Sequence, residues 1–574
     1  MPVAAAPLIG GMINLAHARI EAAHHGVSLR RCRKRQQSTD ADHWNVEAEG
    51  NALRDTARNP QPGKRAGAGA ECDAIKLSGF ETMAHEQRID HRQQQLGMAL
   101  TGNRFTRIDP AIQPQRGRAE FGRSFEGKDL QGFETADGER VKMQFYQPRE
   151  TAMPIAPPPA TESSRTRLVG FHDLQGRESL QVALQGDWCY VGHMPGNRPN
   201  PLNGKSEDNG TSILDVSNPA QPTLVAHIPG TPNANCRAVQ VVKNPHDGKL
   251  YLARNHETPA ACSFQVFDIT DRSKPKLVSD VGETPAGPLS MAHKGWWDES
   301  TGLYFGSACE PGFRPGGHLV IWDLSNPAKP KYVTNHWLPG QKLTEPYSGD
   351  AGPNLHHPVV DMANQRVYLS YARGGNVAVL DISDISKPKS ILDITIEPPF
   401  KGPHTAMPIH AMKCPNFSPG FGDIRDFIVF VNEASDADYL GHEVRKALFM
   451  LDVTAWDNPL LVDTFRVPDG DFLGRGGRFG PHQYAETRDN KLYSLQDNRN
   501  LLYVAYFSGG LRILDLSDPY DMREVGYYIP QTTATTIPRL KTVIQTNDVD
   551  IDYRGLAYIS DRAGTGLHVI EYLG

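Results

Sequence analysis

The chain has 574 residues, of which 60 are Lys or Arg and 66 are Asp or Glu, giving a formal net charge of −6. This balance does not favour nucleic acid or an acidic membrane surface as a partner. The sequence contains no run of about eighteen apolar residues, so it predicts no membrane-spanning helix.

Residues 1–152 lack the pattern of a folded domain. They are rich in Arg, Gln, His, Ala and Gly, and their apolar residues keep neither a helical nor a strand period. Three interpretations are open: a basic or targeting extension, a disordered segment, or a stretch that is not translated because the true start is Met153. We favour the third, since Met153 begins a linker over 153–164 that leads into a strand. Residues 1–15 lack a basic region ahead of a sustained apolar core, so no secretion signal is predicted.

From residue 165 to 574 one short pattern recurs. An apolar strand ends in an acidic residue, a turn of Ser, Asn, Asp and Pro follows, and a second strand begins. The first strand of the pattern is found at 212–215, 264–268, 319–323, 377–381, 448–452, 510–515 and 567–571. Two further strand-like runs usually lie between copies, as at 367–371.

The period of the repeat predicts the architecture. Its acidic residues return roughly every 50 to 70 residues, a spacing typical of radial β arrays. Four strands per repeat and seven repeats predict an all-β, seven-bladed β-propeller over 165–574. The last copy has no partner strand after it, but 167–171 matches the missing strand, so we expect an N-terminal strand to close the ring. An open β array or a pair of sandwiches is the alternative.

These repeats resemble the LVIVD-repeat family, named for the strand that ends in the acidic residue. The resemblance covers about 165–574. It implies the propeller fold and says little of function, because propellers carry many unrelated activities.

Four consecutive blades place a histidine where the innermost strand is expected to begin. Counting back about ten residues from the second strand of a blade leads to His293, His357 and, from 492–494, His482. His410 has the same setting in the blade with the longer inner hairpin. The register at His356 and His357 is open by one residue. At the equivalent inner position, the other blades carry Gln181, Arg237 and Asn547-Asp548 instead of a histidine.

Equivalent positions of a propeller point at one axis, so these four imidazoles are expected to converge. Convergent neutral imidazoles suit Fe, Cu, Zn or Ni. We therefore predict a transition-metal site made by His293, His357, His410 and His482, with Fe or Cu favoured and Zn as the other choice. The competing interpretation is a set of polar channel residues bonded to water or backbone.

A second layer of side chains is predicted around this site. The second strand of each blade returns to the same mouth, and Glu310 and Glu433 follow such strands, where they can orient a histidine ligand. The Gly-rich loop at 474–481 runs into His482, and its Arg475 and Arg478 can clamp an anion such as a carboxylate. Solvated loop charges are the alternative for each of these residues.

We expect a metal-dependent oxidoreductase that acts on a small organic molecule. A four-histidine propeller centre is similar to the iron site of the carotenoid- and stilbene-cleaving dioxygenases, and a His-lined propeller is similar to the methanethiol oxidase and selenium-binding family. The chain shares no sequence pattern with either family, so both are analogies. The alternatives are a non-catalytic propeller that binds protein or ligand, and a metal-dependent hydrolase or lactonase with ligands from Asn547-Asp548.

Five cysteines fall within the propeller, an odd number with no CxxC motif. This predicts neither a disulfide framework nor a zinc ribbon and favours a reducing compartment. Together with the lack of a secretion signal, it leads us to expect a cytoplasmic protein. The sequence does not predict the oligomeric state.

Overall fold

The computed structural model describes residues 162–348, 352–395, 402–420, 422–433, 446–486, 501–538 and 542–574, and six short strands before them. Contacts divide the chain into two units, 1–151 and 152–574. In the first unit the described residues form the pairs β1–β2, β3–β6 and β4–β5. Their bounds are β1 Arg30–Cys32, β2 Cys72–Ala74, β3 Met98–Ala99, β4 Phe133–Glu134, β5 Arg140–Val141 and β6 Gln144–Phe145. The predictions made for the rest of 1–152, and for 153–161, lie outside the described residues.

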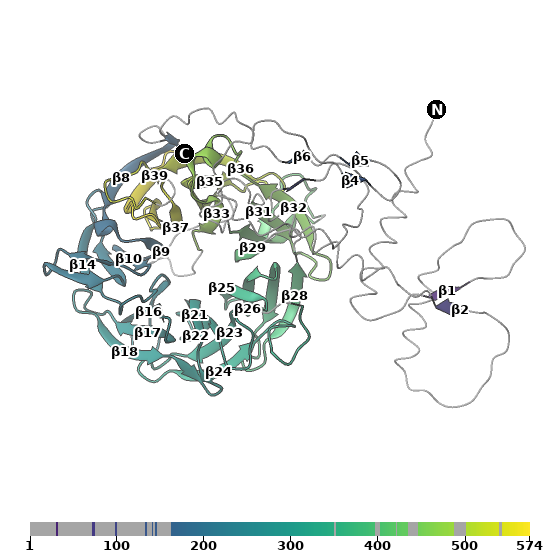
Figure 1. The fold of residues 1–574 in the computed structure, drawn as a ribbon, viewed down its shortest axis with the longest axis horizontal. Helices are drawn as coiled ribbons and strands as arrows, with labels where there is room; N and C mark the ends of the chain where they lie inside the picture. The colour runs from purple at the N-terminus through teal and green to yellow at the C-terminus, as the bar shows by residue number, and fades with distance from the viewer. Residues whose placement is uncertain are drawn as a thin grey trace, which may run out of the picture. The chain divides into compact units, whose positions relative to one another are not determined.

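The second unit is a ring of seven antiparallel four-stranded blades (Figure 1), which confirms the predicted all-β propeller. The first six blades run outward from the axis in chain order, and the seventh takes its outermost strand, β8, from the start of the propeller. The sixth and seventh blades share one nine-stranded sheet, because Phe507 of β34 pairs with Thr546 of β37. None of the helices in the described part of the chain is long and apolar enough to cross a membrane.

The strands of the first four blades are as follows. Blade one has β9 (Ser179–Gln185), β10 (Trp188–His193), β13 (Thr211–Asp215) and β14 (Thr223–Ile228), with the hairpin β11 (Asn197–Asn200) and β12 (Lys205–Asp208) inserted. Blade two has β15 (Val239–Lys243), β16 (Leu250–Glu257), β17 (Cys262–Asp268) and β18 (Lys276–Val281), followed by the hairpin β19 (Glu283–Thr284) and β20 (Gly287–Pro288). Blade three has β21 (Met291–Trp297), β22 (Leu303–Cys309), β23 (His318–Asp323) and β24 (Lys331–His336). Blade four has β25 (Asn354–Asp361), β26 (Arg366–Arg373), β27 (Asn376–Asp381) and β28 (Lys389–Thr395).

The remaining three blades follow the same order. Blade five has β29 (Pro403–Lys413), β30 (Ile424–Asn432), β31 (Leu448–Asp452) and β32 (Leu460–Phe465). Blade six has β33 (Phe479–Tyr484), β34 (Leu501–Phe507), β35 (Leu511–Asp515) and β36 (Arg523–Ile529), preceded by the short helix α4 (Phe472–Arg475). Blade seven has β37 (Thr546–Ile551), β38 (Leu556–Asp561), β39 (Leu567–Tyr572) and the N-terminal strand β8 (Thr166–His172), after which comes the 3-10 turn η1 (Leu174–Gly176).

The repeated strand that ends in an acidic residue is the third strand of each blade. In β27, Val377 and Val379 are fully buried because the blade packs against a neighbour on each face. Asp381 ends the strand and accepts a hydrogen bond from the backbone N–H of Ser383 at 2.8 Å. Asp215, Asp323 and Asp515 cap their turns in the same way, each at 2.8 Å. The acidic residue is therefore fixed by turn chemistry, since an Asp side chain can satisfy the N–H two residues on.

The ring is closed by a strand from the start of the propeller, as predicted. β8 pairs with β39, with Gly170 opposite Val569 (Figure 1). The residues just before it form β7 (Glu162–Ser164), which pairs with β36 of blade six. The segment 162–172 thus bridges the last two blades, and part of the segment predicted as a linker is a strand. Pairing both outer edges removes unpaired strands that would favour aggregation.

Candidate metal centre

The inner strands carry β-bulges at the end that opens onto the axial pocket. In β25, Leu355 pairs with Tyr371 and His357 with Ser370, which leaves His356 without a partner in the ladder. In β29, Pro403 pairs with Asn432 and Thr405 with Val431, which leaves His404 in the same position. A bulge leaves one residue unpaired and turns its side chain away from the regular alternation. His356 and His404 are therefore equivalent residues of adjacent blades.

Blades three, six and seven repeat this feature. The register shifts between Ala292 and Gly295 around His293, and between Phe479 and Gln483 around His482. In blade seven it shifts between Thr546 and Asp548, around Asn547. The shifts of these five blades thus coincide with five residues that line the pocket, and four of the five are histidines.

The four imidazoles line one pocket of about 60 Å³, together with Glu433. Their rings form a row: the centroids of His293 and His356 lie 4.3 Å apart, those of His356 and His404 3.7 Å, and those of His404 and His482 4.2 Å. Gln181, Arg237, Lys294, Asn547, Asp548 and Arg562 are among the other lining residues. The polar residues expected from blades one, two and seven are all in this pocket.

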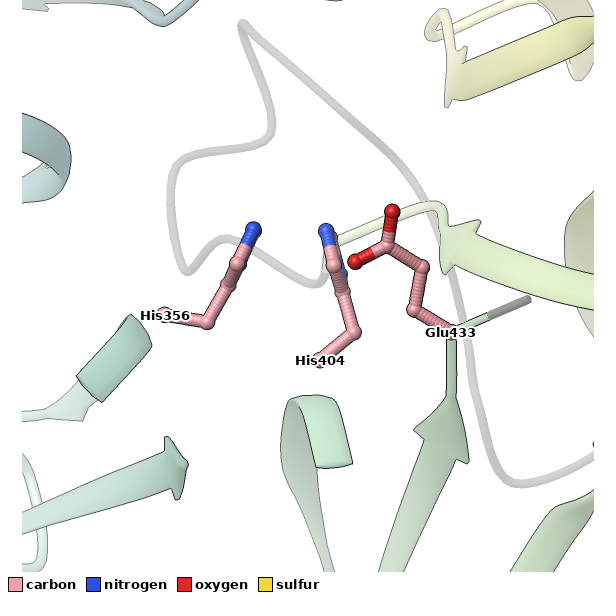
Figure 2. Close-up of side chains that lie close together, drawn as sticks. All are labelled: His356, His404 and Glu433. Atoms are coloured by element: carbon pink, nitrogen blue, oxygen red, sulfur yellow. The ribbon is translucent and has the colours of Figure 1, made fainter. Parts of the chain in front are cut away.

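His356, His404 and Glu433 each offer one ligand atom, and these atoms lie within 4.8 Å of one another. Figure 2 shows both rings projecting the same way, with the carboxylate of Glu433 beside His404. Ligands of one transition metal stand roughly 3 to 3.5 Å apart, since each bond is about 2.0–2.2 Å. Small side-chain rotations would therefore bring this group onto an ion.

The protonation states suit a metal. Burial lowers the pKa of His356 and His404 well below 6.5, and lowers that of His482 to about 3. The imidazoles are therefore neutral at physiological pH, the form that binds metals. Burial acts to raise the pKa of Glu433, but His482 and the Arg478 guanidinium outweigh it and lower this pKa to about 2. Glu433 is thus an ionised ligand.

Hydrogen bonds decide which nitrogen of His482 and His404 is available. His482 Nδ1 contacts the carbonyl oxygen of Asn547, which can only accept, so the proton lies on Nδ1 and the Nε2 lone pair is left for a ligand. Nε2 lies 3.8 Å from the Glu433 carboxylate. His404 Nδ1 lies 2.8 Å from the hydroxyl of Thr405, which itself donates to Gln483 Oε1 at 2.6 Å. The proton of His404 is therefore also on Nδ1, the arrangement common in metal-binding histidines.

His293 is held in the opposite tautomer. Its Nδ1 accepts from Arg237 Nη2, and an arginine can only donate, so the proton of the neutral imidazole lies on Nε2. Nε2 is 2.8 Å from His356 Nε2 and donates to it. Arg237 in turn is paired with Glu257 at 3.1 Å. His293 is therefore a hydrogen-bond donor in this arrangement, while His356, His404 and His482 are acceptors able to bind an ion.

A buried network supports the pocket from beneath. Gln483 Nε2 donates to Glu486 Oε1 at 2.7 Å, and the same oxygen lies 2.7 Å from His357 Nε2 and 3.9 Å from Lys294 Nζ. The candidate ligand His404 is connected to this network through Thr405 and Gln483. Burial raises the pKa of the neighbouring Asp548 well above its ordinary value. These contacts fix the orientation of the ring of His404.

The structure places two of the four histidines predicted as ligands in the pocket, His293 and His482. His357 is one residue out of register, and its buried ring faces Glu486 while His356 takes the site. His410 lies at the far end of β29, where Nε2 bonds Asp361 at 2.7 Å and 35% of its side chain is exposed. The histidine predicted for blade five, His410, thus lies six residues after His404, the one that lines the pocket.

Of the second layer, the structure places Glu433 in the pocket lining and Arg478 in contact with it. Arg478 Nη1 donates to Glu433 Oε1 at 2.7 Å, so the carboxylate belongs with the candidate ligands and the arginine orients it. Glu310 bonds the buried His318 at 2.8 Å within blade three, away from the pocket lining. Arg475 pairs with Glu162 of β7 at 2.6 Å and Asp471 at 2.8 Å. It therefore secures the closing segment instead of clamping an anion bound in the pocket.

Sequence reasoning missed His404, although a signal was present. β29 has 11 residues and β30 has nine, so counting back about ten residues from the start of β30 reaches only the far end of β29, short of the pocket. The end of β30 leads directly to Glu433, and its last residue, Asn432, pairs with Pro403 beside His404. Counting across the hairpin from Glu433 would have found His404.

Comparison with known proteins identifies the repeat. The LVIVD repeat matches residues 206–228, 315–336 and 499–529, which hold the third and fourth strands of blades one, three and six. The chain therefore carries LVIVD repeats. No curated protein matches the sequence.

Several solved propellers have a similar chain trace. A periplasmic gluconolactonase of Pseudomonas aeruginosa is 12% identical, with 60% of this chain and 83% of that chain covered and a TM-score of 0.37. A putative 6-phosphogluconolactonase of Bacteroides fragilis is 10% identical, with 68% and 94% covered and a TM-score of 0.37. The Cps50 (Swd1) propeller domain of Myceliophteria thermophila is 12% identical, with 71% and 99% covered and a TM-score of 0.39. Likenesses this weak carry no inference about activity.

Proposed function

We propose that this LVIVD-repeat propeller is a metal-dependent enzyme, an oxidoreductase that acts on a small organic molecule in the axial pocket. His356, His404, His482 and Glu433 would hold the ion. The observation that carries the proposal is the convergence of His356, His404 and Glu433, with His482 Nε2 3.8 Å from the same carboxylate. His404 and His482 are in the tautomer that leaves Nε2 available. Channel residues that only bind water would not need the same tautomer, with Nε2 free to accept, in two neighbouring blades.

The donor set favours iron. Within it, His356, His404 and Glu433 supply two histidines and one carboxylate, the ligands of many non-haem Fe(II) oxygenases, and imidazole also suits copper and zinc. An iron held here would supply oxygen chemistry. The chain's own residues bind and orient: Arg478 holds the carboxylate of Glu433, and Thr405 and Asn547 hold the rings of His404 and His482.

A zinc-dependent hydrolase is the second candidate. The same histidine and glutamate donors occur in zinc hydrolases. Asp548 adds an observation in its favour, since this carboxyl lines the pocket and burial raises its pKa well above the ordinary value. A carboxyl group that keeps its proton can act as a general acid.

Metal analysis of the full chain tests the proposal. After reconstitution with Fe(II), Cu(II) or Zn(II) we expect about one ion per chain, and a His404→Ala/His482→Ala double variant that folds normally but retains little of it. Bound iron with oxygen consumption in the presence of small organic acids would support the oxidoreductase, and bound zinc with ester hydrolysis would support the hydrolase. A folded propeller that takes up none of the three metals would overturn both and favour a non-catalytic binding protein.

A further inference from the structure

Three of the residues that line the pocket present hydrogen-bond donors. Arg237, His293 and Lys294 are consecutive around the axis and all line the pocket. Arg237 and Lys294 are cations, and His293 presents an N–H at Nε2 because Arg237 occupies its Nδ1. The acceptor side, with His404, His482 and Glu433, lies beyond His356 in the row of rings. The pocket is thus divided between groups for a cation and groups for an anion.

We propose that the side formed by Arg237, His293 and Lys294 is a subsite for the carboxylate of a small organic acid, which binds beside the metal. This inference rests on the proposed function, because it names the substrate class of the same pocket. A carboxylate accepts hydrogen bonds only, so a wall of donors matches it, and a planar guanidinium matches its geometry.

The charge of the lining supports an anion. Three lining residues are cations, namely Arg237, Lys294 and Arg562, whereas the lining carboxyl groups are Glu433 and Asp548. A divalent ion would add to the positive charge. Glu257 pairs with Arg237 and Glu486 lies near Lys294, so a bound anion would chiefly offset the charge of the added ion, in a region of low dielectric where unbalanced charge is costly.

The donors of this side retain capacity for a ligand. Arg237 Nε is buried and has no hydrogen-bond partner among the described residues, although Nη2 of the same side chain contacts Glu257 and His293. Lys294 Nζ is 3.9 Å from Glu486, which is longer than a hydrogen bond. The hydrogen bond from His293 Nε2 to His356 can transfer to an incoming carboxylate, and this would release the Nε2 lone pair of His356 for the metal. Anion binding and metal binding are therefore expected to strengthen each other.

Calorimetric titration of the full chain with acetate and with inorganic phosphate tests this inference. Acetate is expected to bind, more tightly in the metal-loaded protein, and Arg237→Gln is expected to weaken it about 10- to 100-fold, since a hydrogen bond to a charged group contributes ~1.5–3 kcal/mol. Arg237→Lys should recover part of the affinity, because lysine keeps the positive charge but lacks the planar guanidinium that binds a carboxylate through two parallel hydrogen bonds. Arg475→Gln is the matched control, because this arginine pairs with Glu162 outside the pocket and its loss should leave acetate binding unchanged.

Each outcome decides the matter. No acetate binding with or without metal, equal binding by the wild type and Arg237→Gln, or binding of phosphate alone would overturn the inference. If Arg237→Gln does not fold, Lys294→Gln replaces it with the same expected direction. Metal content measured on the same samples separates this inference from the proposed function: metal uptake without acetate binding overturns only the subsite, and acetate binding without metal uptake overturns only the metal centre.

Discussion

His356 and His404 occupy the same bulged position of adjacent blades, and their ring centroids lie 3.7 Å apart. Each has a second histidine close by in sequence, His357 and His410, whose ring points elsewhere. The two pairs provide matched substitutions, since both members of a pair lie on one strand but only one faces the pocket.

The first prediction concerns blade five. His404→Ala should lower metal content at least tenfold, because it removes a candidate ligand, while His410→Ala should leave metal content unchanged. His410 is partly exposed, so loss of its contact with Asp361 should cost only about 0–1 kcal/mol. Elemental analysis and urea unfolding of both variants provide the check. Equal metal loss in the two variants would contradict the assignment.

The second prediction concerns the register in blade four. His356→Ala should weaken metal binding and have a modest effect on folding. His357→Ala should retain metal but lose about 1–3 kcal/mol of unfolding free energy, since it leaves the buried Glu486 with one polar neighbour fewer. Metal titration beside denaturant unfolding separates the two effects. The reverse pattern would place His357 in the site.

The third prediction is a loss of stability in mild acid. The folded-state pKa of His482 is about 3, below its ordinary value of 6.5, so between these values the unfolded chain binds a proton that the native protein does not. Stability is therefore fully present above pH 6.5 and is lost as the pH falls toward 3. From pH 6.5 to 5 this histidine alone should account for about 2 kcal/mol.

Denaturant unfolding of the metal-free protein across this range measures the slope. His482→Gln should reduce the slope by about one proton, because glutamine does not titrate. His293, His356 and His404 should contribute in the same direction, as burial lowers the pKa of each. A slope that is the same in the wild type and in His482→Gln would show that this histidine is not buried in the neutral form.

The fourth prediction concerns ring closure. Gly170 of β8 lies against the backbone of Pro219 and Ala220 in the turn of blade one, so a methyl group there would collide with main-chain atoms. Gly170→Ala should therefore cost about 1–3 kcal/mol, as is usual for overpacking. Leu168→Ala, on the same strand but 47% exposed, should cost well below 1 kcal/mol. Thermal unfolding of the two variants makes the comparison, and equal Tm values would argue against close packing at the closure.

The sequence by itself determined the repeat, the number of blades and the closing strand. These features depend on local chemistry that can be read along the chain: buried third strands, and an Asp that caps the turn two residues later. The sequence also indicated that one polar residue of each blade faces the axis, because a propeller directs equivalent positions to one centre. His293 and His482 were located in this way, and Glu433 was located from the end of a second strand, although as a residue that orients a ligand. His482 was located by counting from 492–494, residues outside the described part, although the second strand of blade six is β34.

Only the tertiary structure decided which histidines meet. A bulge shifts the alternation of a strand by one residue, and this selects His356 over His357 without any local sequence signal. The length of the β29–β30 hairpin moves the pocket end of blade five from His410 to His404. The tautomers depend on partners far away in sequence, since Arg237 contacts His293 across 56 residues and Asn547 contacts His482 across 65. Such contacts exist only after the ring has closed, and they decide which nitrogens can bind an ion.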